Sequence, residues 1–360
     1  MGYEIDFLPV GTGTQCGDAI AIRFGNLHAE RDEQVIVVID GGFKETGQKV
    51  VHHIYKYYHT DHVDLAVSTH PDADHSSGLS VVLEKLKVDC LWMHLPWEHT
   101  DDIARMFKDG RITDNSVSEM LRRSLDDVRN LARIAEAKGI AVIEPFTGVQ
   151  DDSGHIEVIG PSEDFYEELL LDFRSTPEPR VEGSFLKRAV EAGVGLAARV
   201  AESLHIETLD DSGETTAENN SSTILQIFVD GRRLLFTADA GIPALSYAAD
   251  YIEQCGQNTV GWRFVQVPHH GSKRNVGPTI LDRLIGPKLR QEEKKATAYA
   301  SVPKNGLPKH PAKRVTNAFC RRGAPVYPTN DTTIWHHQEA PNREDFGPIE
   351  PLPLYEEFDE

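Results

Sequence analysis

Three apolar, strand-like runs of this chain each end directly in side chains that can bind metal ions. The first run, VDLAVS, is followed by His70, Asp72, Asp74 and His75. The run RRLLFTAD ends at Asp239, and WRFVQVPHH ends at His269 and His270. Short apolar runs bounded by turn residues are typical of buried β-strands. Since strands of one sheet can deliver their ends to a common edge, the recurrence predicts an α/β fold with one composite site.

The residue types in these clusters are those of a divalent metal site. Zinc and manganese take imidazole nitrogens and carboxylate oxygens. Alternate residues of an extended turn point the same way, so His70, Asp72 and Asp74 can face one pocket while His75 turns into the following helix. One loop can therefore serve two adjacent ions. Taken alone, Asp239 fits a turn equally well, so the recurrence of the pattern carries the prediction.

Length and composition set the frame for this site. The chain has 360 residues, 39% of them hydrophobic, and four well-separated cysteines without a C-x-x-C pair. We expect one compact domain with insertions and reduced thiols. No run approaches the roughly 20 apolar residues of a membrane span, and the N-terminus does not resemble a signal peptide. We therefore expect a cytoplasmic protein that does not engage a membrane.

The remaining sequence alternates between strand and helix patterns. Strands are expected over 3–10, 19–24, 35–40, 88–95, 140–145, 155–161 and 223–229, and helices over 79–86, 162–173 and 184–204. The region 100–139 reads as helical and closes at Gly139. Its predicted core-facing stripe consists of Val117, Met120, Leu121, Leu125, Val128, Leu131, Ala132 and Ala135. The acidic, proline-rich tail over 341–360 is expected to be irregular.

Charge is distributed unevenly along this acidic chain. The formal net charge is -20, but residues 263–322 hold 14 Lys and Arg against 3 Asp and Glu, which is 14 - 3 = +11. Everything else therefore carries -20 - 11 = -31. Taken alone, such a region is more often a solvated face than a binding site. Because it also contains the His269–His270 pair, it can attract an anionic substrate to the predicted metal site.

Six ordered motifs resemble the metallo-β-lactamase superfamily, and within it the hydrolase domain of DNA-uptake proteins of the ComEC/Rec2 type. The motifs are VIVVIDGG (35–42), STHPDADHSSG (68–78), ENNSSTIL (218–225), LLFTADA (234–240), VPHHGS (267–272) and ASVPKNGLPKHP (300–311). The later GAPVYPTNDTTI is similar to the closing strands of the family. The resemblance spans about residues 3–335, with apparent insertions at about 96–140 and 162–217.

The resemblance implies an αββα sandwich over residues 1–340 with a binuclear metal site at one sheet edge. His70 and Asp72 would bind the first ion, and Asp74, His75 and His269 the second. His270 is the alternative to His269, because a sequence does not show which member of a His pair turns inward. Asp239 would bridge both ions. Asp40 would orient a metal-bound imidazole.

Two departures from the common superfamily pattern bear on the metal. Asp72 stands where a histidine is usual, and ENNSS replaces the usual third histidine of the first ion, offering Asn219, Asn220, Ser221 and Ser222. Both departures are shared by the ComEC/Rec2-type group. More oxygen ligands shift the preference from zinc toward manganese or magnesium. We therefore expect two divalent ions, zinc or manganese, with magnesium also compatible.

The expected reaction is phosphodiester hydrolysis by a hydroxide that bridges the two ions and is held by Asp239 or Asp74. His310 or Lys304 would protonate the leaving oxygen, although a solvated loop role fits both equally. The substrate-binding candidates are Asn220, Ser222, Lys273, Arg274 and Lys309. A polyphosphate backbone suits the basic region, so we expect a nuclease that takes DNA in preference to RNA.

Two alternatives remain open from the sequence. One is a hydrolase of small esters, lactones or thioesters, which predicts a compact apolar pocket and activity that does not respond to salt. The other is a module with a silent or weak site whose insertions at 96–140 and 162–217 dock a protein partner. Activity that appears only when such a partner is added would favour this second alternative.

Overall fold

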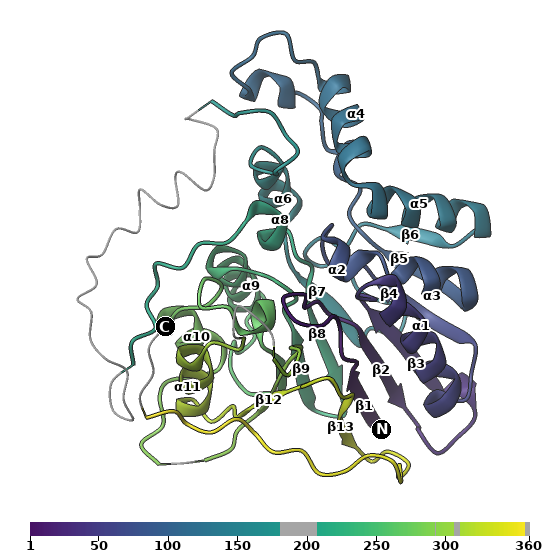
Figure 1. The fold of residues 1–360 in the computed structure, drawn as a ribbon, viewed down its shortest axis with the longest axis vertical. Helices are drawn as coiled ribbons and strands as arrows, with labels where there is room; N and C mark the ends of the chain where they lie inside the picture. Colours follow the sequence, from purple (N-terminus) through teal and green to yellow (C-terminus); the bar gives the residue numbers. More distant parts are fainter. Residues whose placement is uncertain (181–206, 292, 306–309, 357–360) are drawn as a thin grey trace.

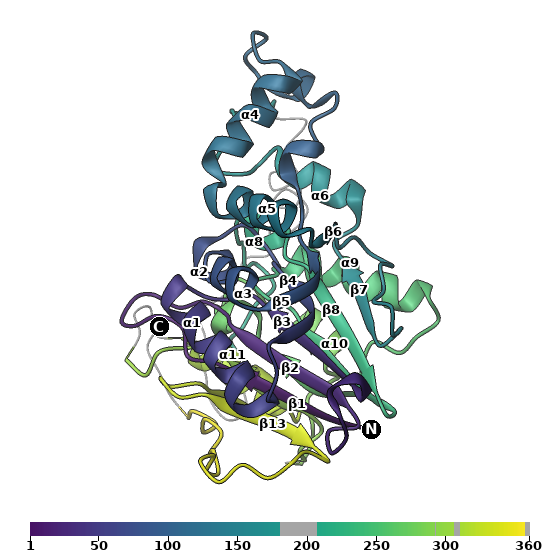
Figure 2. The same ribbon diagram turned by 90° about the vertical axis from the view of Figure 1, so that its right-hand side faces the viewer.

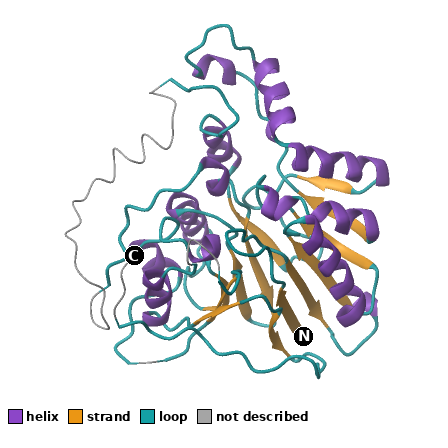
Figure 3. Cartoon of the chain, viewed as in Figure 1, coloured by secondary structure: helices purple, strands orange, loops and turns teal. Residues whose placement is uncertain are grey.

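Two β-sheets pack against each other in this protein, and helices cover their outer faces (Figure 1, Figure 3). The structure is a computed structural model that describes residues 1–180, 207–291, 293–305 and 310–356. The predicted αββα sandwich is confirmed by this layering. Among the described residues, no helix is both long and apolar enough to cross a bilayer.

The seven-stranded sheet runs in the order β13-β1-β2-β3-β4-β5-β6. Its strands are β1 (Gly2–Phe7), β2 (Ile20–Gly25), β3 (Gln34–Ile39), β4 (His62–Val67), β5 (Lys87–Trp92), β6 (Ala141–Ile143) and β13 (Ile334–Gln338). The strands from β13 to β3 pair antiparallel, and those from β3 to β6 pair parallel. Antiparallel pairing of β2 with β3 places the start of β2 beside the end of β3, at the edge where β4 also ends.

The six-stranded sheet runs in the order β12-β11-β10-β9-β8-β7. Its strands are β7 (Ile156–Gly160), β8 (Ile224–Val229), β9 (Arg232–Phe236), β10 (Trp262–Gln266), β11 (Thr297–Ala300) and β12 (Val326–Pro328). The strands from β9 to β12 are parallel, whereas β7, β8 and β9 pair antiparallel. The parallel strands β9 and β10 therefore end at the same edge, as the ligand pattern requires.

Strand residues alternate between two hydrophobic cores. Val37 and Ile39 of β3 pack between the sheets with Phe236 and Phe264, whereas Ile36 of the same strand faces the outer helices. Successive side chains of a strand point to opposite faces, so a strand that is buried on both faces must be apolar throughout. This explains the continuous apolar run VIVVI in β3, which lies inside the sandwich.

The helices divide between the two outer faces (Figure 2). The seven-stranded sheet is covered by α1 (Lys44–His53), α3 (Leu79–Lys85) and α5 (Asp126–Lys138), which pack side by side. The six-stranded sheet is covered by α9 (Ile242–Gln254), α10 (Pro278–Leu284) and α11 (Lys313–Arg321). Two one-turn helices, α2 (Ala73–Ser76) and α8 (Ala217–Asn220), lie at the sheet edge between them. A further helix, α6 (Glu163–Leu170), packs on α8. Shorter turns are η1 (Arg31–Glu33), η2 (Ile54–Tyr58), η3 (Pro96–Glu98), η4 (Ile103–Met106) and η5 (Pro268–Gly271).

Residues 96–125 form an arm that projects from the sandwich and carries α4 (Asp114–Ser124) (Figure 1, Figure 2). The helix begins at Thr113, whose side chain accepts from the Ser116 amide in a reciprocal capping arrangement. The predicted single stripe is divided here, because Leu125 separates α4 from α5 and Met120 is exposed. As expected, α5 ends at Gly139, whose positive φ suits glycine. The predicted helix over 184–204 lies outside the described residues.

The C-terminal segment, residues 341–356, forms no helix or strand but is anchored by one buried arginine. Arg343 makes ion pairs of 2.7 Å with Asp6 and 3.1 Å with Glu4, both on β1. The same two carboxylates also take Arg23, His53 and Tyr58. We call these six residues the Arg343 cluster. The segment that the sequence predicted only as an irregular tail therefore packs on the outer face of β1, in the seven-stranded sheet.

Candidate metal centre

The predicted ligand clusters meet at one edge of the sandwich. The loop after β4 carries His70 and His75, and the turns after β9 and β10 carry Asp239 and His269. The two sheets are joined here, because the Thr223 amide donates to the Thr69 carbonyl at 2.9 Å. On the second sheet, the His269 amide donates to the Ala238 carbonyl at 3.0 Å. Both halves of the sandwich therefore supply side chains to one site.

The Asp239 carboxylate lies at the centre of four imidazoles. Its Oδ2 is 3.5 Å from Nε2 of His75, 3.5 Å from Nε2 of His269 and 3.8 Å from Nε2 of His70. Its Oδ1 is 3.7 Å from Nε2 of His270. The sequence left His269 and His270 as alternatives, and the structure turns both toward Asp239. One carboxylate facing ligand atoms from every cluster has the arrangement expected of a bridging group.

Hydrogen bonds on the far side of two rings fix which nitrogen carries the proton. His75 Nδ1 lies 2.8 Å from Asp40 Oδ2, which only accepts. Thr69 donates its hydroxyl to Asp40 at 2.7 Å, so its oxygen accepts from His70 Nδ1 at 3.0 Å. His269 Nδ1 faces both an acceptor, Asn275 Oδ1 at 2.9 Å, and a donor, Asn219 Nδ2 at 3.2 Å. In the neutral rings of His70 and His75 the Nε2 lone pair then points at Asp239.

The centre therefore brings together imidazole nitrogens and carboxylate oxygens that lack hydrogen-bond partners, as the ligands of a cation do. Buried side-chain atoms without a hydrogen-bond partner in the described residues include Nε2 of His70, Nε2 of His75, both ring nitrogens of His270 and Oδ1 of Asp239. Buried polar atoms are almost always paired, because leaving one unpaired costs about 1–3 kcal/mol. Separations of 3.5–3.8 Å are too long for hydrogen bonds. Two atoms that share one ion at roughly 2.0–2.1 Å stand about 3.4 Å apart, so a divalent cation fits.

The titration behaviour also indicates this demand for positive charge. Burial lowers the pKa of His75, but the Asp239 and Asp40 carboxylates outweigh it and raise that pKa well above its usual range. Burial acts to raise the pKa of Asp239, yet His269, His75 and His270 hold it well below its usual range. Burial lowers the pKa of His270 to about 3, so this ring stays neutral and can act as a ligand. A bound ion would replace the proton on His75.

Asp18 is a member of the centre that the sequence did not reveal. One ligand atom each from Asp18, His75, Asp239 and His270 lie within 4.8 Å of one another, and all four residues are buried. Burial and the neighbouring carboxylates raise the pKa of Asp18 well above its usual range, although His75 opposes the shift. Asp18 precedes a strand instead of following one. The feature that could have revealed Asp18 is the antiparallel pairing of β2 with β3, which places Asp18 beside Asp40. The Asp18 carbonyl there accepts from the Gly42 amide at 2.8 Å.

The backbone is strained around the centre. Asp40, Ala238, His269 and His270 have φ values of +55°, +44°, +46° and +57°. Residues with a side chain rarely adopt this left-handed region, and such strain gathers at functional sites where surrounding structure enforces it. Asp40 shows why it is enforced here. Its carboxylate accepts from the Thr69 amide at 2.9 Å as well as from the Thr69 hydroxyl and His75, so it holds the ligand-bearing loop after β4 at two points.

Asp72 and Asp74 lie differently from the histidines of the same loop. Asp72 precedes α2, is partly exposed, and its Oδ1 is bound by the Arg174 guanidinium. Asp74 is mostly buried, and burial raises its pKa against the opposing effect of His75. The Asp74 backbone also packs on Gly17, where a Cβ would stand 2.0 Å from the Asp74 carbonyl oxygen. Neither aspartate joins the tight ligand groups found within the described parts of the chain.

The ENNSS motif forms α8 and the turn after it, beside the centre. Asn219 Nδ2 lies 3.2 Å from His269 Nδ1 and donates to Thr215 at 2.7 Å. Asn220 Oδ1 and Ser222 Oγ are buried and have no hydrogen-bond partner in the described part of the chain. Glu218 points away from His269 toward Arg174. Asn219 is therefore the residue of this motif that contacts a ligand imidazole, whereas the predicted residues Asn220 and Ser222 lie in the same turn with unpartnered polar atoms.

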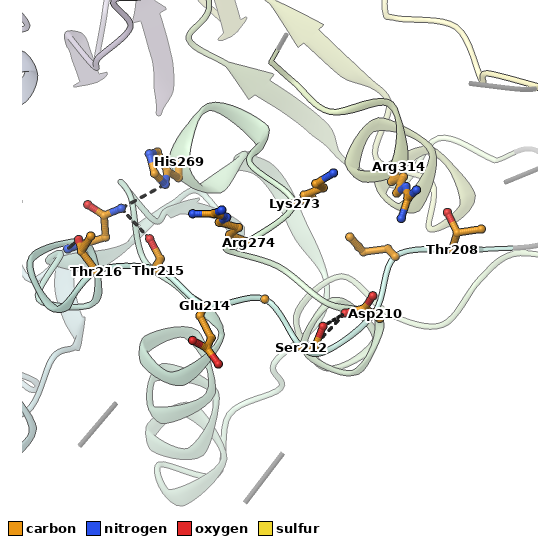
Figure 4. A pocket seen from close by; sticks show the side chains of 13 residues that line it. Thr208, Asp210, Ser212, Glu214, Thr215, Thr216, His269, Lys273, Arg274 and Arg314 are labelled. Atoms are coloured by element: carbon orange, nitrogen blue, oxygen red, sulfur yellow. Dashed lines mark hydrogen bonds between the residues drawn. The ribbon is translucent and has the colours of Figure 1, made fainter. Parts of the chain in front are cut away.

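A polar pocket of about 660 Å³ opens next to His269 (Figure 4). Lys273 and Arg274 lie between His269 and Arg314, and the acidic residues Asp210 and Glu214 lie on the opposite wall. The fold buries part of the basic region of the sequence and exposes the rest. Arg322 is buried in ion pairs with Glu207 and Asp282, whereas Lys273 and Arg274 are exposed at the pocket.

The other predicted residues of the basic region do not all lie near the centre. The His310 ring centre lies 6.5 Å from that of His269, and burial together with His269 lowers the pKa of His310 to about 4. Lys304 is exposed, its backbone amide donates to Asp331, and it is not among the residues lining the pocket. Lys309 lies outside the described residues. The structure thus brings His310, but not Lys304, to the edge of the centre.

Comparisons with known proteins add little to this geometry. No family model and no curated protein matches the chain. A Thermotoga maritima protein assigned to the metallo-β-lactamases is similar over 71% of this chain and 93% of its own, with 8% identity and a TM-score of 0.35. The Rm3 metallo-β-lactamase is similar over 78% of this chain and 84% of its own, with 9% identity and a TM-score of 0.32. At these scores the fold rests on the sheet order and site geometry of the chain itself.

Proposed function

We propose that this protein is a metal-dependent phosphodiesterase, and that it acts as a nuclease with DNA preferred over RNA. The observation that carries the proposal is the convergence of three imidazole Nε2 atoms on the Asp239 carboxylate, beside a pocket with Lys273, Arg274 and Arg314. The first feature calls for divalent cations, and the second suits a phosphate backbone.

The chain offers distinct residues for binding the ions. Asp18, His75, Asp239 and His270 form one compact group, and His70 and His269 face Oδ2 of the same Asp239 carboxylate. Divalent ions bound there would polarise a phosphate oxygen and lower the pKa of a water molecule. The residues around them fix ring orientation, since Asp40, Thr69 and Asn275 each hold a ligand imidazole from behind.

The pocket supports a phosphodiester over a neutral substrate. Lys273 and Arg274 are exposed beside His269, so they can neutralise phosphates on either side of a scissile bond. A lactone or thioester hydrolase calls for an apolar pocket, whereas this one is lined by charged and hydroxyl side chains. We therefore favour a nucleotide chain as the substrate.

His310 has a narrower role than the sequence suggested. With a pKa lowered to about 4, its ring is neutral at pH 7 and does not begin the reaction as a charged proton donor. It can orient a phosphate oxygen or accept a proton next to His269. An anionic phosphate bound nearby would raise the pKa of His310 and prepare it to protonate the leaving oxygen.

The direct test is cleavage of single-stranded DNA, double-stranded DNA, RNA and cyclic dinucleotides with Mn²⁺, Mg²⁺ or Zn²⁺. We expect DNA cleavage by the wild type and a loss of at least about a hundredfold in an Asp74→Ala, His75→Ala variant. The matched control is His62→Ala, Asp89→Ala, which removes the same residue types from an exposed pair and should retain activity. No cleavage with any metal, or equal cleavage by the first variant and wild type, would contradict the proposal.

Salt dependence separates a phosphate chain from a neutral substrate. In kcat/KM measurements against salt concentration, Lys273→Ala and Arg274→Ala should each reduce the slope of the log–log plot by about one. A hydrolase of neutral esters would show no such slope. If the wild type cleaves DNA with a flat salt profile, these two side chains do not bind the phosphate backbone.

A further inference from the structure

Arg174 binds Asp72, one of the two predicted metal-binding carboxylates that lie outside the tight ligand groups. Its Nη2 binds Asp72 Oδ1, and its Nε donates to Glu218 Oε1 at 3.0 Å. Its backbone amide donates to the same Glu218 oxygen at 2.6 Å. Glu218 is buried, and its Oε2 has no hydrogen-bond partner within the described ranges. The guanidinium therefore sits between two carboxylates, as a bound cation would.

The loop that carries Arg174 is fixed from a second direction. The Lys108 amide donates to the Glu178 carbonyl at 3.1 Å, and the Arg180 amide donates to the Met106 carbonyl at 2.8 Å. These bonds tie Glu178 and Arg180, which follow Arg174 on its loop, to residues 106–108 of the projecting arm. Arg174 is thus positioned by the arm on one side and by α8 on the other, so its contact with Asp72 is a built part of the fold.

The other carboxylates of the centre have no arginine or lysine partner among the described residues. Asp18 accepts from the neutral amide of Gln266 at 2.8 Å, and Asp40 accepts from Thr69 and His75. Asp239 faces only imidazoles at 3.5–3.8 Å. These groups face no permanent cation, whereas Asp72 shares its charge with the guanidinium of Arg174.

We infer that Arg174 competes with a divalent cation for Asp72, so the centre has one tight ion position and one weak position. The tight position is the group of Asp18, His75, Asp239 and His270. We assign Asp72 to the weak position together with His70, which lies two residues before it on the same loop. The guanidinium opposes the second ion in two ways: it occupies an oxygen of Asp72, and its positive charge repels the incoming cation. This inference rests on the proposed metal centre.

The test measures metal binding and does not depend on activity. Metal-stripped protein is titrated with Mn²⁺ by calorimetry, and bound metal is counted after gel filtration. We expect one tight and one weak ion in the wild type. Arg174→Gln keeps a polar side chain but removes the charge, and it should tighten the weak ion by about tenfold, which is about 1.4 kcal/mol, without changing the tight one.

Two further variants keep the outcome interpretable. Asp72→Asn should lose the weak ion and retain the tight one, and Arg111→Gln, which removes an exposed arginine paired with Asp109, should match the wild type. Thermal melting checks that each variant folds. An unchanged or weakened second ion in Arg174→Gln, or two equally tight ions in the wild type, would overturn the inference alone. A wild type that binds no Mn²⁺, Mg²⁺ or Zn²⁺ would overturn the proposed function as well.

Discussion

The protein buries two groups of ionisable side chains, and they are built in opposite ways. In the Arg343 cluster every carboxylate meets a cation or a donor: the ion pairs of Glu4 and Asp6 span 2.5–3.1 Å. At the metal centre, imidazole nitrogens stand 3.5–3.8 Å from Asp239. Both groups are buried except for His269, whose side chain is 30% exposed at the pocket. Burial of charge is therefore shared by both and does not distinguish a functional site.

The difference lies in how the charges are balanced. The charges of the Arg343 cluster pair with one another at 2.5–3.1 Å, so the cluster serves the packing of the C-terminal segment on β1. The metal centre holds its imidazole nitrogens 3.5–3.8 Å from Asp239, and it does so with left-handed backbone at Asp40, Ala238, His269 and His270. Ligand-type atoms held apart by a strained backbone indicate a group that the chain does not supply.

The largest effect should come from Asp239→Asn. Replacing the shared carboxylate by an amide removes the charge that faces all four imidazoles, so we expect loss of both ions and a fall in activity of at least about a thousandfold, beyond the 10–100-fold typical of outer residues. Metal counting and cleavage kinetics check this. Retained stoichiometric binding would show that Asp239 is not the bridging group and would remove the contrast between the two buried groups.

Arg343→Ala, unlike Asp239→Asn, should lower the stability of the fold and leave metal binding unchanged. Removing one partner of a buried ion pair leaves Glu4 and Asp6 undercompensated, which typically costs about 3–5 kcal/mol of unfolding free energy. Urea denaturation measures this, and metal binding should be unchanged in the folded variant. The matched control is Arg122→Ala, an exposed partner of Glu98, which should cost about 0–1 kcal/mol. Impaired metal binding in Arg343→Ala would link the two groups.

The pH dependence of stability should also reflect the Arg343 cluster. Burial acts to raise the pKa of Asp6, but His53 and Arg343 outweigh it and lower that pKa to about 2. Its unfolded value is about 3.9, so Asp6 contributes about 2–3 kcal/mol above pH 4, and this is lost as pH falls toward 2. Urea denaturation at pH 5, 4 and 3 follows the loss. In Asp6→Asn the fall should be smaller, and an equal fall would assign it to other carboxylates.

The smallest of these effects should come from Asp40→Ala. The variant leaves the imidazole of His75 in place but removes the carboxylate that orients it, so metal affinity should weaken by about 10–100-fold without complete loss. Calorimetry with Mn²⁺ measures the affinity. Asp61→Ala, which breaks an exposed pair with Lys87, is the control and should bind metal normally. Unchanged affinity in Asp40→Ala would mean that packing alone orients His75.

Local sequence pattern predicted much of the fold and part of the site. Strand-terminal position brought His70, His75, Asp239 and the His pair to one edge, because parallel strands deliver their ends together. Asp18 was missed because it precedes its strand, and only the antiparallel pairing of β2 with β3 brings it to that edge. Arg174 and Arg343 lie far in sequence from the carboxylates they bind, so no local periodicity could indicate them.

The two sheets contribute separate halves of the centre. Asp18, Asp40, His70 and His75 belong to loops of the seven-stranded sheet, and Asp239, His269 and His270 to turns of the six-stranded sheet. A cation bound by both sets would link the two sheets at this edge of the sandwich. Removing the cation should then increase the rate of amide hydrogen exchange along the facing edges of the two sheets. The backbone amides around the Arg343 cluster on the outer face should keep their protection.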